Sequence, residues 1–361
     1  MPVVKGPFMQ RFEKKEDVVA WLNDFHHPDL VAGWASTPDV VSWSRKTLSV
    51  TLPFAANPLL KSIRTWLKDQ VTSPPFSVSC RPVRLRNHLG KTVQDIKNII
   101  AVTSAKGGVG KSTIAVNLAL ALSQSRAEVG LLDADIYGPS IPTMLGTTGR
   151  SLKVSENKWM QPIYAHGLHS NSIGYLMDDS SAAIWRGPMA SKALQQLLNE
   201  TVWPELDYLV IDMPPGTGDL QLTLAQQIPV TSVVVVTTPH ALALADAVKG
   251  IAMFDKLGIS VAGFIENMSY HICGQCGHTE TTFGTEGADQ LAEKYEAPVL
   301  ARFPLNIQMS EGCDKGAPVT ISRPNSRCST LYLELSQRIA SRIFWQGRRV
   351  LEEIPIKNLD Q

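Results

Sequence analysis

One short segment constrains this chain more than any other, a glycine-rich turn between an apolar strand and a helix. The run Ile99–Thr103 predicts a buried strand, and the turn that follows contains Gly107, Gly108 and Gly110. Glycines permit backbone conformations that aim successive N–H groups at phosphate oxygens, beside the positive N-terminus of the predicted helix Ser112–Gln124. There, Lys111 can neutralise the β- and γ-phosphates, and the Ser112 hydroxyl can bind Mg²⁺. The segment therefore predicts a site for a nucleoside triphosphate with magnesium.

The pattern around this segment predicts an α/β fold. From residue 98 onward, apolar runs rich in β-branched residues alternate with segments of helix length. The runs are Ile99–Thr103, Val129–Leu132, Tyr208–Ile211, Val233–Thr237, Val261–Ile265 and Val299–Phe303, and the helices are Ser112–Gln124, Met189–Glu200, Asp219–Gln227 and Ala241–Leu257. Strands that are apolar throughout are typical of a mostly parallel sheet with helices on both faces.

The first part of the chain has a different pattern. It predicts, in order, a helix, a strand, a helix and a strand, at Glu13–Asn23, Thr47–Leu52, Asn57–Gln70 and Phe76–Cys80. We therefore predict a small α+β domain with its polar linker over residues 1–95, the nucleotide-binding domain over residues 96–345, and a polar C-terminal tail over residues 346–361.

Composition argues against several classes of partner. The 361 residues carry a net charge of +1 and no long basic run, so there is no electrostatic case for binding nucleic acid or a membrane surface. The N-terminus lacks the apolar stretch of a signal peptide, and no apolar run is long enough to span a bilayer. We expect a cytoplasmic protein. The cysteines are few and odd in number, unlike a disulfide framework: Cys80, Cys273, Cys276, Cys313 and Cys328.

Three aspartates follow apolar strands of the predicted sheet. Asp133 and Asp135 come after one strand, and Asp212 comes directly after another. The carboxyl ends of parallel strands meet at the ligand-binding edge of such a sheet. We expect Asp212 to hold Mg²⁺ through water and Asp133 to belong to the shell of the same ion. The alternative for each is a helix cap or a turn former, which the nearby phosphate loop makes less favourable.

A close cysteine pair, Cys273 and Cys276, is predicted to lie in a loop after the strand Val261–Ile265. The two-residue spacing lets both thiolates face one metal centre, although zinc sites and iron–sulfur clusters usually need four ligands. His271 and His278 lie too close to the cysteines to complete a tetrahedral site without strain. The residues by themselves leave open an iron–sulfur site, a zinc site and a thioredoxin-like redox pair.

The phosphate loop resembles a variant class. Ala105 stands where the general pattern has a glycine, and a second lysine, Lys106, follows it. The segment resembles the deviant Walker A loop of the MinD, ParA and nitrogenase iron-protein class. That resemblance implies a homodimer in which Lys106 reaches the partner's phosphates, and an Asp135 that orients the attacking water. The catalytic set is then Lys106, Lys111, Asp135 and Asp212, and the nucleotide-binding loop is Ala105, Lys106, Gly107, Gly108, Val109, Gly110, Lys111, Ser112 and Thr113.

Four longer motifs, at residues 132–142, 185–189, 212–219 and 266–277, resemble the Mrp/ApbC family of iron–sulfur cluster carriers. The resemblance covers about residues 98–345 and implies an ATPase that passes clusters from an assembly scaffold to apo iron–sulfur client proteins. It also implies that Cys273 and Cys276 of two subunits together supply four thiolates to one bridging 4Fe-4S cluster. In related nucleotide folds, the position of Asn267 contacts the adenine base.

The first 95 residues look like a diverged version of the small iron–sulfur-assembly domain of that family. That domain commonly has a cysteine after its central strand, whereas residues 52–58 contain none, so a scaffold or client-docking role is the safer prediction. Two other functions are weighed against the carrier. A MinD- or ParA-type positioning ATPase needs a membrane-binding helix or a basic surface, and a nitrogenase-like reductase has cluster ligands that are farther apart in sequence.

Overall fold

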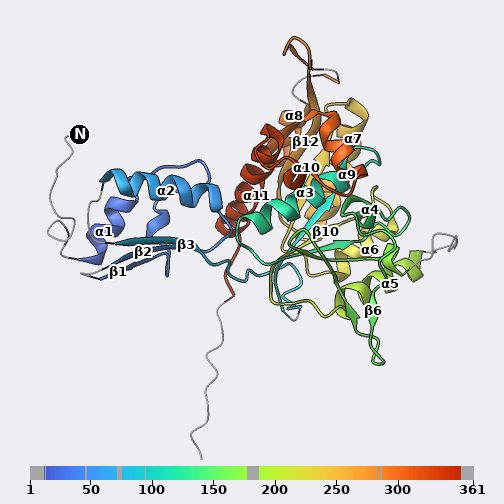
Figure 1. Ribbon diagram of the computed structural model, residues 1–361, viewed down its shortest axis with the longest axis horizontal. Helices are drawn as coiled ribbons and strands as arrows, with labels where there is room; N and C mark the ends of the chain where they lie inside the picture. The colour runs from blue at the N-terminus through green and yellow to red at the C-terminus, as the bar shows by residue number, and fades with distance from the viewer. Residues whose placement is uncertain are drawn as a thin grey trace, which may run out of the picture.

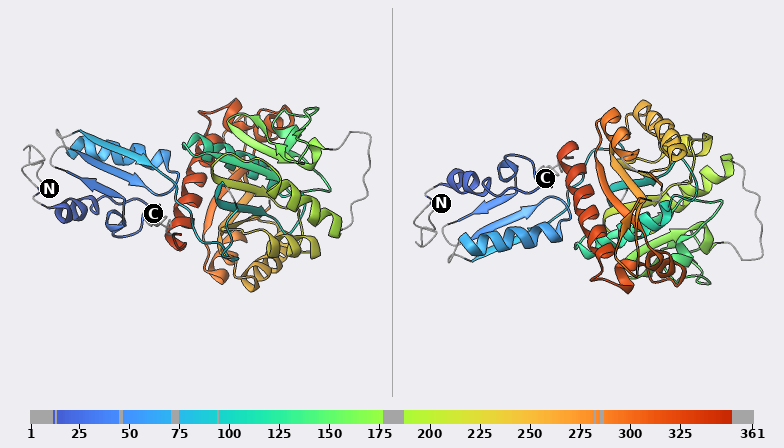
Figure 2. Two further views of the ribbon diagram at one scale, coloured as in Figure 1. Left: turned by 90° about the horizontal axis from the view of Figure 1, so that it is seen from below. Right: turned by 90° about the horizontal axis from the view of Figure 1, so that it is seen from above.

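The computed structural model describes residues 12, 14–44, 47–70, 75–93, 95–176, 187–281, 283–284 and 287–350 (Figure 1). Residues 185 and 186 of the second family motif and residues 351–361 of the predicted tail lie outside this set. The described chain forms a small N-terminal region beside a larger domain, and the two lie end to end along the long axis of the molecule (Figure 2).

A large sheet organises the second domain. Within the described residues it has nine strands, in the order β13-β12-β11-β4-β10-β5-β9-β8, with β14 paired to β12. Antiparallel pairing is confined to β8 with β9 and β13 with β12, and the other pairs are parallel, which confirms the predicted fold class. The strands are β4 (Ile96–Thr103), β5 (Val129–Asp133), β8 (Ile163–Ala165), β9 (Leu168–Ser172), β10 (Leu206–Asp212), β11 (Ser232–Thr237), β12 (Val261–Ile272), β13 (Thr279–Glu280) and β14 (Val299–Leu305).

Helices cover both faces of this sheet, which explains why its central strands are apolar throughout. On β4, Ile100 and Val102 face the core formed with α3 and α11, while Ile99 and Ala101 face the core formed with α5, α6 and α7. The helices are α3 (Lys111–Gln124), α4 (Ile141–Met144), α5 (Gly187–Asn199), α6 (Asp219–Gln227), α7 (Ala241–Lys256), α8 (Gly287–Tyr295), α9 (Ile307–Asp314), α10 (Val319–Ser322) and α11 (Arg327–Gln346). A two-stranded hairpin, β6 (Lys153–Val154) with β7 (Met160–Gln161), stands apart from the sheet.

The N-terminal region has the predicted α+β character. Its described strands form a three-stranded sheet in the order β1-β2-β3, in which β2 is antiparallel to β1 and parallel to β3. The elements are α1 (Lys15–Leu22), the 3₁₀ turn η2 (Trp34–Ser36), β1 (Val41–Trp43), β2 (Leu48–Leu52), α2 (Asn57–Gln70) and β3 (Phe76–Cys80). Alternate residues of β2 are buried, so one face of the sheet packs on the helices.

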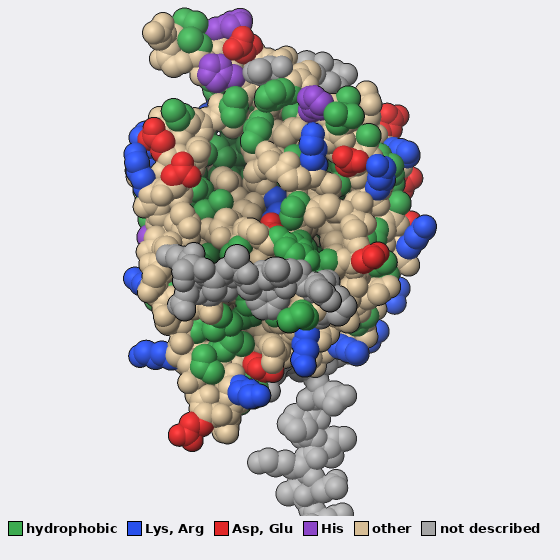
Figure 3. Space-filling model, turned by 90° about the vertical axis from the view of Figure 1, so that its right-hand side faces the viewer, with side chains coloured by type: hydrophobic (Ala, Val, Ile, Leu, Met, Phe, Trp, Pro, Cys, Tyr) green, Lys and Arg blue, Asp and Glu red, His purple; other side chains and the backbone are tan. Residues whose placement is uncertain are grey.

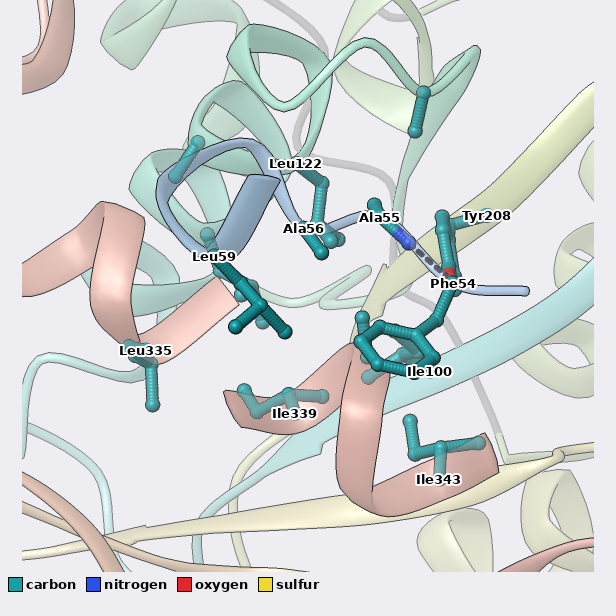
Figure 4. Close-up of a cluster of buried hydrophobic side chains, with 14 of the residues drawn as sticks. Phe54, Ala55, Ala56, Leu59, Ile100, Leu122, Tyr208, Leu335, Ile339 and Ile343 are labelled. Carbon is teal, nitrogen blue, oxygen red and sulfur yellow. Dashed lines mark hydrogen bonds between the residues drawn. The ribbon is translucent and has the colours of Figure 1, made fainter. Parts of the chain in front are cut away.

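The segment after β2, where the family domain commonly carries a cysteine, is buried against the larger domain. Phe54, Ala55 and Ala56 are at most 1% exposed, and the Ala55 N–H donates to the hydroxyl of Tyr208 on β10 at 3.3 Å (Figure 4). The Leu59 N–H donates to Oε1 of Gln337 on α11 at 2.6 Å. The two regions therefore share one continuous apolar core, and this segment packs between them instead of facing a ligand.

This packing places the N-terminal region far from the phosphate loop. The side chain of Asn57 donates to the carbonyl of Gln124 at the C-terminal end of α3, whereas the phosphate loop precedes the N-terminal end of the same helix. Likewise, Tyr208 lies near the start of β10 and Asp212 at its end. Figure 3 shows the side remote from the N-terminal region, where hydrophobic side chains surround a hollow in which basic and acidic side chains are visible.

Strand β12 and the segment after α11 extend the predictions made from the sequence. Strand β12 runs on to Ile272 instead of ending at Ile265, because its later residues pair with β13 and β14, pairing that the local apolar pattern does not reveal. After α11, the Val350 N–H donates to the Arg84 carbonyl at 3.0 Å, so this part of the chain lies beside the linker. None of the helices in the described ranges combines the length and apolar character needed to cross a membrane.

Candidate functional site

The glycine-rich turn connects β4 to α3, as the sequence predicts. Gly108 and Gly110 have φ values of +81° and +83°, in the left-handed region where only glycine is unstrained. A Cβ at Gly110 would also lie 2.3 Å from Nδ2 of Asn267, so this position excludes a side chain for two reasons. The turn ends where the first N–H groups of α3 are free of helical partners, which favours an anion at this point.

Ala105, the departure from the general glycine pattern, lies near α7. A Cβ added to Gly250 of α7 would lie 3.9 Å from the Ala105 methyl group, an ordinary van der Waals distance, so there is room for the methyl group whether or not position 250 is a glycine. Around this residue the turn is closed by a hydrogen bond from the Ser104 hydroxyl to the Lys106 carbonyl at 3.0 Å.

Lys111 lies at the centre of a buried charge cluster. It is 6% exposed, and its Nζ is 2.6 Å from Oδ1 of Asp212 and 3.6 Å from Oδ2 of Asp135. Nζ also lies 3.2 Å from the Ser112 hydroxyl. The structure thus brings the predicted lysine, serine and two aspartates together at the carboxyl ends of β4, β5 and β10, where parallel strands present ligand-binding groups.

The carboxylate of Asp212 has a free acceptor. It is fully buried, and its Oδ2 has no hydrogen-bond partner among the described residues. A buried carboxylate oxygen without a partner is costly, and a hydrated cation beside it would satisfy it. Together with the Ser112 hydroxyl, this oxygen fits the oxygen-rich shell that Mg²⁺ prefers.

Asp133 is committed to the loop that follows its strand. Its Oδ2 accepts hydrogen bonds from the backbone of Ser140 and Ile141 and from the Ser172 hydroxyl, at 3.1, 3.2 and 2.9 Å, and its Oδ1 accepts one from Asp135 N at 3.2 Å. Complete burial, and then repulsion from Asp212, raise its pKa to about 7. Asp133 thus holds the backbone of Asp135 in place, and its place in a magnesium shell stays a prediction.

Asp135 is less enclosed than its neighbours. Burial raises its pKa, and the charge of Lys111 opposes this rise. Lys106 differs from Lys111 in its surroundings, since its side chain is exposed and makes no ion pair within the described part of the chain. One lysine of the loop is therefore neutralised inside the subunit, while the other is available to a group outside it.

The segment after β10 is tied to the phosphate loop. The Gly216 N–H donates to the Ser104 carbonyl at 2.9 Å, and Gln221 on α6 donates to the hydroxyl of Thr103 and to the Pro214 carbonyl. Gln221 is 3% exposed. No local pattern predicts this role for Gln221, because an amide in the first turn of a helix has no signature unless the strand that it contacts is known.

Asn267 contacts the phosphate loop directly. Its Nδ2 donates to the Val109 carbonyl at 2.8 Å, and Asn267 is only 5% exposed. An amide of this kind has a second N–H and a carbonyl oxygen, which match the donor and acceptor on an adenine edge. The predicted contact with the base stays a prediction, but the structure places the residue beside the loop that would hold the nucleotide.

The cysteine pair occupies the turn of a hairpin. Strands β12 and β13 pair antiparallel at its base, and the turn is closed by hydrogen bonds from Cys273 N to the His278 carbonyl and from Gly277 N to the Cys273 carbonyl, both 2.9 Å long. Cys276 is exposed and Cys273 partly so. Within the described chain, no group of three or more Cys, His, Asp or Glu residues is arranged to hold a metal ion. The described part of one subunit therefore offers two cysteine side chains on this turn and no third candidate metal ligand beside them.

The Cys273 thiol should be reactive at lower pH than an ordinary cysteine. Backbone N–H groups of Cys276 and then Gln275 donate to its sulfur and lower its pKa, whereas burial raises the pKa of Cys80. Because the thiolate is the reactive form, raising the pH should activate Cys273 before Cys80. Iodoacetamide labelling of the metal-free protein between pH 6 and 10, read by peptide mass spectrometry, measures both profiles. Labelling of Cys80 at the lower pH would contradict this assignment.

Comparison with known proteins connects this geometry to a family. A family model described as "ParA: NUBPL iron-transfer P-loop NTPase" matches residues 95–340. The chain belongs to this family. It is 49% identical over 357 residues to the iron–sulfur cluster carrier protein of Escherichia coli K12, which covers 94% of this chain and 95% of that protein. It is 44% identical over 255 residues to the mouse iron–sulfur cluster transfer protein NUBPL, over 70% of this chain and 80% of that one.

Solved structures agree with the assignment. A nucleotide-binding protein from Archaeoglobus fulgidus in complex with ADP is 36% identical, with a TM-score of 0.55 over 62% of this chain and 87% of that protein. The cell-division ATPase MinD of Pyrococcus furiosus, at 20% identity and a TM-score of 0.50, covers 67% of this chain and 98% of its own, and shares the fold. These comparisons confirm the resemblance that the motifs indicated and the P-loop NTPase class of the larger domain.

Proposed function

We propose that this protein is an ATP-hydrolysing carrier that holds a 4Fe-4S cluster between two subunits and passes it to apo client proteins. The observation that carries this proposal is the incomplete metal site: each subunit presents Cys273 and Cys276 on an exposed turn, with no third ligand among the described residues. Iron–sulfur clusters of this type take four thiolates, which two such turns together would supply. The names of the relatives support a carrier over a positioning ATPase or a reductase.

The nucleotide site provides the chemistry for hydrolysis. The N–H groups of the turn and the start of α3 would bind the phosphates, and Lys111 would exchange its contacts with Asp212 and Asp135 for phosphate oxygens. Magnesium, held by Ser112 and through water by Asp212, would neutralise the charge that develops on the phosphates. Asp135, freed from Lys111, would then orient the water that attacks the γ-phosphorus.

A homodimer is the second part of this proposal. Lys106 is exposed and unpaired within the described chain, as expected of a lysine that completes the partner's phosphate site. Positive charge at the γ-phosphate in the transition state is worth several orders of magnitude in rate. Hydrolysis would therefore depend on dimer formation. A cytoplasmic location is consistent with five free cysteines, which persist in a reducing compartment.

Anaerobic reconstitution with iron and sulfide tests the proposal. The expected product is a dimer that contains about four iron and four sulfide ions, hence about two of each per chain, with the Mössbauer spectrum of a 4Fe-4S cluster. Native mass spectrometry gives the dimer mass and the metal content together. A stable monomer with one zinc ion, or a dimer that holds no iron, would reject the carrier assignment.

A further inference from the structure

One strand connects the nucleotide site to the cysteine turn. Strand β12 carries Asn267, which is bonded to the phosphate loop, and ends at Ile272, directly before Cys273. Its last residues pair with β13, His271 opposite Glu280 and Ile272 opposite Thr279. A single strand thus leads from Asn267 to the thiols, and along this stretch its pairing with β14 is irregular only between Glu266 and Tyr270.

The strand is irregular at the point where it meets the phosphate loop. From one paired position to the next, β12 advances from Glu266 to Tyr270 while β14 advances only from Arg302 to Pro304, so β12 bulges between them. Met268 in this bulge has a φ of +54°, which costs a residue other than glycine about 1 kcal/mol or more. The bulge turns Asn267 toward the Val109 carbonyl, and the surrounding contacts must maintain this unfavourable backbone.

A buried carboxylate clamps the bulge. Glu266 is 1% exposed and accepts hydrogen bonds from the Ser269 hydroxyl, from Ala288 N on α8 at 3.0 Å and from Arg302 Nε on β14 at 3.2 Å. Arg302 in turn reaches Asp289 on α8 at 2.5 Å. Glu266 and Ser269 lie on either side of the bulge, so the Glu266 carboxylate connects the two sides to each other. Through Ala288 and Arg302 it also connects the bulge to α8 and β14.

We infer that Glu266 and Arg302 are positioning residues that couple nucleotide binding to the cysteine turn through β12. Glu266 is anchored to β14 and α8, so it acts as a fixed point on one side of the bulge. When a nucleotide binds Asn267 and displaces the bulge, the Glu266 side therefore stays in place. The movement is transmitted on the opposite side of the bulge, through Tyr270 to Cys273. This inference rests on the proposed function, because it links the two ligands of the same site.

The substitution Arg302→Met tests the coupling in the full-length protein. A nonhydrolysable ATP analogue with Mg²⁺ should change two rates in the native protein by at least about fivefold, a typical allosteric coupling. These are the alkylation rate of Cys273 and Cys276 in metal-free protein and the rate at which a chelator removes iron from loaded protein. For each rate, we take the ratio of its value with the analogue to its value without it. In the Arg302→Met variant both ratios should be about one, while nucleotide affinity and dimer mass stay unchanged. Arg302→Lys, which keeps the charge beside Glu266, should restore part of the effect.

Dimer formation by itself would shield the thiols equally in the native protein and in the variant. A ratio of about one in the variant, at unchanged dimer mass, therefore identifies the coupling. Arg338→Met is the matched control, because Arg338 bonds to the Leu300 carbonyl on the same strand β14 but not to the bulge. It should leave the ratios at their native values.

Three outcomes would overturn the inference. They are native ratios in Arg302→Met, ratios of one in native protein that binds both nucleotide and cluster, and a loss in Arg338→Met as large as in Arg302→Met. If no cluster loads, the proposed function fails, whereas the alkylation ratio still decides the coupling. If Arg302→Met does not fold, Asp289→Asn removes only the outer partner of Arg302 and should reduce the ratios, so unchanged ratios there would also reject the inference.

Discussion

Substitution of Lys111 by methionine is expected to lower the rate of ATP hydrolysis by at least about two to three orders of magnitude, the usual loss when one group that stabilises transition-state charge is removed. Methionine is similar in length but carries no charge for the β- and γ-phosphates. The change also leaves Asp212 and Asp135 without the cation that lies 2.6 and 3.6 Å from them. Steady-state phosphate release and the binding of a fluorescent ATP analogue measure the two consequences.

The matched control is Lys106→Met, a substitution in the same loop. Because Lys106 is exposed, this variant should keep its fold and its nucleotide affinity as a monomer, and lose hydrolysis in the dimer. Removing Lys111 leaves buried carboxylates uncompensated, which costs about 3–5 kcal/mol in comparable buried pairs, so the fold of that variant must be verified by circular dichroism. Native hydrolysis rates in Lys111→Met would contradict the assignment of the phosphate site.

The double substitution Cys273→Ala/Cys276→Ala is expected to abolish the visible absorbance of the reconstituted cluster. Both cysteines lie on a turn at the end of β12, and of the five cysteines they are the pair with the shortest separation in the sequence. A dimer of this variant loses all four proposed thiolates at once, so no partial site is left. Iron and sulfide analysis after anaerobic reconstitution measures the loss.

Other properties of this variant should be unaffected, because the turn is exposed and lies outside both apolar cores. We expect an unchanged melting temperature and native affinity for ATP. Cys80→Ser is the control for nonspecific effects of cysteine removal, since Cys80 lies on β3 of the N-terminal region and its thiol donates to the Ser125 carbonyl. Full cluster absorbance in the double variant would disprove the cluster site.

The predictions that succeeded depend on short-range patterns with a physical requirement behind them. A glycine-rich turn between a strand and a helix needs no distant contact to be recognised, and parallel strands necessarily bring their carboxyl ends to one edge. Lys111, Ser112, Asp135 and Asp212 accordingly lie together at that edge, while their roles toward a nucleotide stay predictions. The alternation of apolar strands and helices likewise was enough to predict a sheet covered on both faces.

Other features depend on contacts between distant parts of the chain. The full length of β12 and the bulge at Asn267 require β13 and β14 as partners, and the commitment of Asp133 to the loop after β5 requires the approach of Ser172. The burial of residues 54–56 against α11 and β10 is equally invisible in a segment of seven residues that contains no charge. None of these contacts produces a periodic pattern of apolar residues in the sequence around it.

By itself, then, the sequence determined which reactive groups this protein carries: a phosphate loop with two lysines, aspartates at strand ends and a pair of thiols. Each of these is encoded within a few neighbouring residues, because the backbone geometry that they need is local. The tertiary structure alone decided how these groups are connected. Only the folded chain places Asn267 on the Val109 carbonyl and anchors Glu266 to Arg302, since residues far apart in sequence meet there through the packing of the sheet.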